Sequence, residues 1–174
     1  MSGSSAERES FRLVLPYRYF ALCDWLVEPS VEETNALLAV ARADIAASDG
    51  RQVIICPAPD SPVTVHFEYL GARPAGITTG PDEWDGHIDL EVECPSGRIY
   101  IDQPTTQPID LKDTLAAGPG TYAVRVARRG RQDETSPARD TPGRSGPEEY
   151  LVQMWHTGPL SPSTIEELED LDEH

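Results

Sequence analysis

Short segments in which apolar and polar residues alternate recur along this chain, and they constrain its fold more than any other feature. The clearest runs from Pro62 to Leu70, where Val63, Val65 and Phe67 alternate with polar residues. Successive side chains of a β-strand point to opposite faces, so this pattern predicts a half-buried strand. Apolar or alternating segments of the same kind occupy the ranges 11–24, 52–56, 87–94, 98–102, 121–127 and 149–156.

These segments predict roughly seven or eight short strands and a mainly β chain, folded as an antiparallel β-sandwich or an open barrel, of which we favour the sandwich. Pro16 divides the first segment, because proline interrupts a strand. Pro95-Ser96-Gly97 predicts a tight turn that joins 87–94 and 98–102 in a hairpin. Ser30 and Glu33 form a capping-box pattern that starts one short helix, expected over about 31–46.

The 174 residues fit one domain, which we expect over 11–157. Polar composition predicts a disordered N-terminus over 1–10 and a flexible loop insertion over 130–147. Residues 158–174 form an acidic C-terminal tail. Within it, Ser163 and Glu166 repeat the capping-box pattern, and we expect a short, marginal helix that is ordered only on docking.

Charge is the strongest compositional signal, because 30 acidic residues face 14 basic ones and the net charge is −16. A surface of this kind repels nucleic-acid phosphates and anionic lipids, so we expect neither as a direct partner. It attracts a basic protein, such as a nuclease, although negative charge also serves solubility alone. No long apolar run or signal-peptide pattern occurs, so we expect a cytoplasmic protein.

The segment 87–94 carries the most informative polar pattern. Its carboxylates Asp89, Glu91 and Glu93 share one face of the expected strand, about 7 Å apart from the strand rise. Three interpretations stay open: a solvated face that prevents edge aggregation, a docking stripe for a basic protein, and a metal or paired-carboxylate site. The preceding loop adds three carboxylates around a tryptophan, which is a candidate interface anchor: Asp82, Glu83, Trp84 and Asp85.

Signs of catalysis are scarce, and the chain contains no familiar nucleotide-binding, nucleophile-elbow or metalloprotease motif. We therefore predict a protein that is not an enzyme and has no cofactor and no metal. Two alternatives remain. One is a cryptic enzyme that uses a carboxylate pair or brings Cys56 or Cys94 beside His66 or His87. The other is a small-molecule binding domain with a pocket between its sheets, lined by Tyr69 and Tyr122.

The order of several segments resembles the ComJ family, the competence proteins that inhibit the DNA-entry nuclease. The early strand reads Leu15-Pro16-Tyr17-Arg18-Tyr19-Phe20, and the helix ends near Ala46-Ala47-Ser48-Asp49-Gly50. Gly118-Pro119-Gly120 then precedes a Tyr-containing strand, and Glu149-Tyr150-Leu151-Val152 closes the domain. The resemblance implies a small cytosolic β-sandwich that binds and blocks a nuclease. It transfers no functional residue, and the 130–147 insertion and acidic tail depart from the family pattern.

Overall fold

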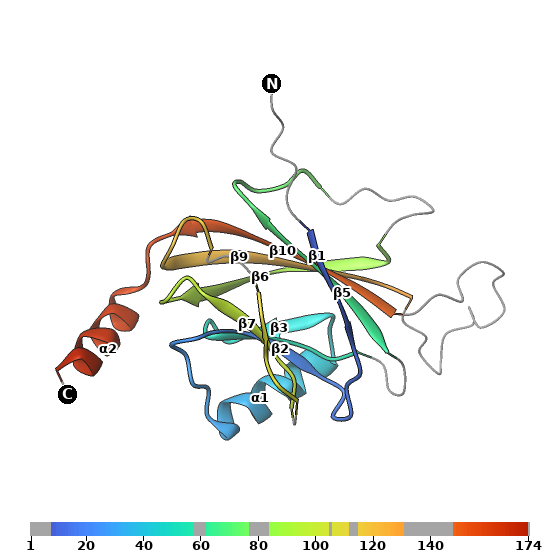
Figure 1. Cartoon of the computed structure of the whole chain (residues 1–174), viewed down its shortest axis with the longest axis horizontal. Helices are drawn as coiled ribbons and strands as arrows, with labels where there is room; N and C mark the ends of the chain where they lie inside the picture. Colours follow the sequence, from blue (N-terminus) through green and yellow to red (C-terminus); the bar gives the residue numbers. More distant parts are fainter. Residues whose placement is uncertain are drawn as a thin grey trace, which may run out of the picture.

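The computed structural model describes residues 8–57, 62–76, 84–104, 106–111, 115–130 and 148–173. In these ranges the chain is mainly β, with ten strands and two helices (Figure 1). The strands are β1 Arg8–Leu13, β2 Phe20–Asp24, β3 Ala46–Ser48, β4 Gln52–Ile55, β5 Val63–Leu70, β6 Gly86–Cys94, β7 Ile99–Asp102, β8 Ile109–Asp110, β9 Gly120–Arg129 and β10 Glu148–Gly158. The helices are α1 Val31–Arg42 and α2 Pro162–Asp172.

The strands form two five-stranded sheets, which we call sheet A (β1-β5-β10-β9-β6) and sheet B (β3-β4-β2-β7-β8). All pairings between these strands are antiparallel except that of β5 with β10, which is parallel. The expectation of a purely antiparallel arrangement is therefore wrong at this one pair. β10 lies between β5 and β9 in sheet A. It pairs antiparallel with β9, which precedes it in the chain, and it therefore runs in the same direction as β5.

One apolar core is shared by the inner faces of both sheets. Sheet A contributes alternate residues of β5, β9 and β10, including the fully buried Tyr122 and Tyr150. Sheet B contributes Phe20, Leu22 and Ile101, and the rings of Phe20 and Tyr150 meet edge to face with centroids 6.0 Å apart. The alternation in the sequence thus marks the residues that this core removes from water.

The predicted hairpin between 87–94 and 98–102 is wrong, because β6 belongs to sheet A whereas β7 pairs with β2 in sheet B. The turn is a corner between the sheets. Buried Asp24 holds this corner: its carboxylate accepts hydrogen bonds from the backbone N–H groups of Leu26, Ser96 and Gly97. The turn residues predict only that the chain changes direction. The hydrogen bonds from Asp24 of β2 hold the turn beside sheet B, which β7 then joins.

The outer face of sheet B is covered by α1, which buries Leu37, Leu38 and Ala41 against it. The predicted capping box of Ser30 and Glu33 is present. The helix ends at Arg42, four residues earlier than expected, since Ile45 turns into the shared core and β3 starts at Ala46. The helical spacing that suggested a longer helix includes Ile45, which lies immediately before this strand instead of in the helix.

Both ends of the chain contain more structure than predicted. β1 begins at Arg8, so the expected disordered N-terminus is too long by residues 8–10, while 1–7 lie outside the described residues. Of the expected insertion, 131–147 also lies outside them, but the flanking β9 and β10 pair as a hairpin would. The acidic tail contains α2, whose N-cap is Ser161 rather than the predicted Ser163.

Candidate docking surface

The predicted carboxylate stripe lies on β6, the edge strand of sheet A, on the face turned away from the core. Asp89 is not available there as a free charge. Its two oxygens accept hydrogen bonds from Nε and Nη2 of Arg125 at 2.7 and 3.1 Å. The Arg125 side chain is only 5% exposed, and its hydrogen bonds lower the pKa of the Asp89 carboxyl below its ordinary value. This carboxylate therefore satisfies a buried guanidinium.

Glu93 is also engaged, because it anchors the start of α2. Its carboxylate accepts hydrogen bonds from the backbone N–H of Ser161, which is the N-cap residue, and from the hydroxyl of Thr164. Burial raises the pKa of Glu93, but these hydrogen bonds more than offset the burial, and that pKa lies below its ordinary value. A carboxylate in this place also interacts favourably with the positive end of the helix dipole.

The rest of the predicted patch is only partly free. Trp84 is half-buried, with the Arg129 guanidinium over its ring at 4.5 Å from the centroid. Asp85 accepts a hydrogen bond from the backbone N–H of Gly130. Asp82 and Glu83 lie outside the described residues. Of the three side chains in the stripe, that of Glu91 alone has a carboxylate with no hydrogen bond or ion pair to any described residue, and Glu91 is exposed. The structure thus places two of the three in internal contacts.

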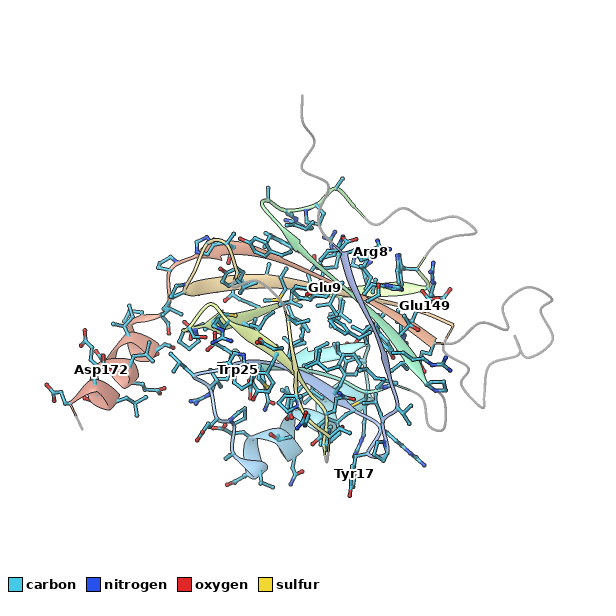
Figure 2. The ribbon with its side chains drawn as sticks, viewed as in Figure 1. Arg8, Glu9, Tyr17, Trp25, Glu149 and Asp172 are labelled. Atoms are coloured by element: carbon cyan, nitrogen blue, oxygen red, sulfur yellow. The ribbon has the colours of Figure 1, made fainter. Side chains whose placement is uncertain are left out.

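The helix α2 differs from β6, because the fold leaves its side chains unburied. It buries none of its residues, and it stands off to one side of the two sheets, with Asp172 near its far end (Figures 1 and 2). The helix and its C-cap residue Glu173 together have six carboxylates and no basic residue: Glu166, Glu167, Glu169, Asp170, Asp172 and Glu173. Within this set, Glu167 lies 3.7 Å from Arg51 in an ion pair whose side chains are 65% and 42% exposed.

A groove of about 260 Å³ separates α2 from the body of the molecule. Its apolar lining comes from both sides, with Leu26 and Val27 on the body and Leu168 and Leu171 on the helix. Leu171 is 68% exposed and Leu26 54% exposed, so neither is used by the core. An apolar groove bordered by carboxylates is suited to a segment that carries both apolar and basic side chains.

The outer face of sheet A holds a polar network that the sequence did not reveal. Ser10 Oγ lies 2.7 Å from His66 Nδ1, and His66 Nε2 lies 3.2 Å from a Glu149 oxygen. Arg129 donates to the same Glu149 oxygen at 2.6 Å. The members come from β1, β5, β10 and β9, so only strand pairing brings them together.

This network contains the side-chain types of a Ser–His–acid triad, but it is arranged as a bridge between strands. Ser10 is exposed on the edge strand β1. Burial raises the pKa of Glu149, while hydrogen bonds from Arg129 and His66 more than offset it, and the pKa is lowered. Glu149 is thus shared with a guanidinium instead of serving the imidazole alone. Figure 2 shows Glu149 and Arg8 on the far side of the molecule from Asp172.

The cysteine–histidine alternative finds no support in the described residues. Cys56 and Cys94 are both buried, in the two separate apolar clusters of the molecule. Burial raises the pKa of the Cys94 thiol far above its ordinary value, which disfavours the nucleophilic thiolate. Nor do three or more His, Cys, Asp or Glu side chains of the described part of the chain converge as a metal site requires.

The residues expected to line a pocket between the sheets are packed instead. Tyr122 is fully buried, its hydroxyl donates to the Gly118 carbonyl at 2.6 Å, and its ring contacts those of Tyr69 and His156. The Tyr69 hydroxyl accepts a hydrogen bond from the backbone N–H of Ala117. Both tyrosines are therefore used in packing contacts, Tyr122 inside the core and Tyr69 against its edge.

Comparison with solved structures finds two similar folds. ComJ from Bacillus subtilis, described as an inhibitor of the DNA degrading activity of NucA, superposes with a TM-score of 0.57 at 10% identity. The match covers 88% of this chain and 100% of ComJ. The crocagin biosynthetic protein J superposes with a TM-score of 0.58 at 17% identity, over 87% of this chain and 98% of that one. These likenesses show a ComJ-like fold.

Comparison with protein-family models and with curated proteins finds no match. No helix of the described residues is long and apolar enough to cross a membrane.

Proposed function

We propose that this chain is a non-catalytic acidic protein that inhibits or regulates a basic protein by binding it, with a nuclease as the favoured class of partner. The observation that carries the proposal is the exposed helix α2, with its six carboxylates and no basic residue. The net charge of −16 supports it, and so does the fold shared with an inhibitor of a DNA-degrading protein. The class of partner rests on that fold likeness alone.

The charges of α2 are placed where the helix itself gains nothing from them. All six follow the first turn, and carboxylates near the C-terminal end of a helix interact unfavourably with its dipole. Pairs such as Glu166 with Asp170 and Glu169 with Glu173 also repel each other, by about 0.2–0.5 kcal/mol per pair. A basic partner would relieve this repulsion when it binds. The electric field of the carboxylates would also accelerate the association of that partner.

The docking surface that follows is α2 with its groove, rather than the stripe on β6. The groove supplies an apolar seat for an anchoring side chain of the partner, while the carboxylates of α2 border it. Among the stripe residues, Asp89 and Glu93 already have internal partners, so only Glu91 is left to extend this surface.

A photo-crosslinking amino acid placed at Leu171 tests this proposal, with Val40 of α1 as the matched position. Both side chains are exposed, at 68% and 59%, on an α-helix. In native cells, we expect Leu171 to cross-link a basic protein that Val40 does not. The purified pair should then bind in a salt-sensitive manner, and the captured protein should lose activity on DNA when bound. Equal labelling from both positions, or a captured protein that does not bind when purified, would contradict the proposal.

A further inference from the structure

A second hollow of about 210 Å³ lies on sheet B, where the first turns of α1 meet the outer face of β2 and β7. Its walls include the rings of Tyr19 and Tyr100 and the carboxylate of Asp102, above Ala21 and Cys23. Val31 of the helix closes one side. None of these residues lines the groove beside α2, so the site is independent of the proposed function.

The strand register explains the shape of this hollow. Ala21 pairs with Asp102, and Cys23 pairs with Tyr100, so two small side chains oppose two large ones across β2 and β7. Tyr19 stands two residues before Ala21 on the same face. Asp102 is therefore flanked by a tyrosine on each side, over a floor that has only the methyl group of Ala21.

The Asp102 carboxylate has no hydrogen bond or ion pair with any other described residue. It is half-buried, and this burial raises its pKa above the ordinary value. The described residues that line the hollow include no Lys, Arg or His. A carboxylate withdrawn from water without a counter-charge is an unusual arrangement, which a bound cation would complete.

The aromatic walls are fixed in place. The Tyr100 ring stacks against Trp25 with centroids 4.4 Å apart, and its hydroxyl lies in hydrogen-bond contact with the Cys23 thiol. Tyr19 and Tyr100 both pack against the cluster beneath α1. Tyrosine rings attract cations through their negative faces, and rings held by neighbours lose little entropy on binding.

From this geometry we infer that the hollow is a binding site for an organic cation, with Asp102 as the counter-charge and Tyr19 and Tyr100 as the aromatic walls. The ligand is an alkylammonium or guanidinium group with an apolar surround. A free small amine and the side chain of a lysine or arginine both offer this chemistry.

Choline and 3,3-dimethylbutan-1-ol provide the test, because they share a shape and differ in charge. In NMR titrations of the full chain, choline should shift the signals of Ala21 and Asp102 with saturation. The neutral alcohol should bind at least about ten-fold more weakly. Equal binding of the two, or no shift by any cation, would overturn the proposal. Titrations with N-acetyl-lysine methylamide and N-acetyl-arginine methylamide distinguish the sources: tighter binding of either one identifies a protein side chain as the ligand, whereas tighter binding of choline identifies a free amine.

The variant Asp102→Asn should weaken choline binding by about ten-fold or more, and the charge-matched control Glu91→Gln, on the other sheet, should leave it unchanged. Tyr19→Ala provides a second variant if Asp102→Asn does not fold, and it should also weaken binding. Equal loss in the control would show that only the overall charge acts, which would overturn the site.

Discussion

The two acidic segments of this chain, β6 and α2, look alike in sequence and differ in structure. On β6, Asp89 binds buried Arg125 and Glu93 holds the start of α2. On α2, Glu167 forms an ion pair with Arg51 at the surface, and the helix buries none of its side chains. The comparison teaches that the number of carboxylates does not identify a docking surface. We propose that the docking surface is the segment whose carboxylates the fold leaves exposed.

The largest effect should come from Asp89→Ala. This change leaves the guanidinium of Arg125 buried without its counter-charge, and we expect it to lower the free energy of unfolding by about 2–3 kcal/mol. The estimate is below that for a fully buried pair, because the Asp89 side chain is 40% exposed. Urea denaturation measures the loss. The control Glu91→Ala, two residues along the same face, should stay within about 0.5 kcal/mol of the parent; an equal loss in both would remove the distinction between used and unused carboxylates.

Glu93→Gln should give the next largest effect, at about 1–2 kcal/mol, because hydrogen bonds to a charged acceptor are replaced by weaker ones. The loss should be concentrated in α2. Hydrogen exchange of the α2 amides should accelerate, while exchange in β5 and β9 stays slow. Uniform acceleration across the sheets would mean that Glu93 supports the whole domain rather than the seating of the helix.

Acidification should lower stability through the carboxylates of β6 and not through those of α2. The folded-state pKa values of Asp89, Glu93 and Glu149 are lowered, so their contribution to stability is present above the carboxyl pKa of the unfolded chain and is lost as pH falls through the folded values. Asp24 acts in the opposite direction, since burial outweighs its hydrogen bonds and raises its pKa. Urea denaturation at a series of pH values from neutral to acid measures the free energy of unfolding. The free energy that is lost on acidification should be smaller in Asp89→Asn than in the parent protein, and it should be unaltered in Glu169→Gln.

The smallest effect on stability, and the most informative for function, should come from Glu169→Gln with Glu173→Gln. Removing like charges at the C-terminal end of α2 should leave stability unchanged or raise it by up to about 0.5 kcal/mol. Thermal denaturation measures this. A clear loss of stability would mean that these carboxylates have internal partners, as those of β6 do.

Much of the fold was predictable from local patterns. The alternation of Val63, Val65 and Phe67 predicts a strand, and Ser30 with Glu33 predicts the start of α1, because both patterns act over a few residues. The corner after β6 was not predictable, since it depends on Asp24, over seventy positions away in the chain. The parallel pairing of β5 with β10 has no local signature either.

The residues of the predicted site were found from the sequence, whereas the contacts that those residues make were not. The sequence showed that Asp89, Glu91 and Glu93 share a face, which the structure confirms. Their partners Arg125 and Thr164 lie 36 and 71 positions away, so their engagement was hidden. The network of Ser10, His66 and Glu149 and the hollow around Asp102 were missed for the same reason: each assembles across strands.

The central claim is tested most directly by the affinity of the captured partner, measured against salt concentration for two charge-matched variants. We predict that Glu169→Gln with Glu173→Gln weakens binding and flattens its salt dependence, whereas Glu28→Gln with Glu32→Gln, exposed near α1, leaves both unchanged. Equal weakening by the two variants would mean that overall charge attracts the partner. Unaltered binding by the α2 variant would contradict the assignment of that helix as the docking surface.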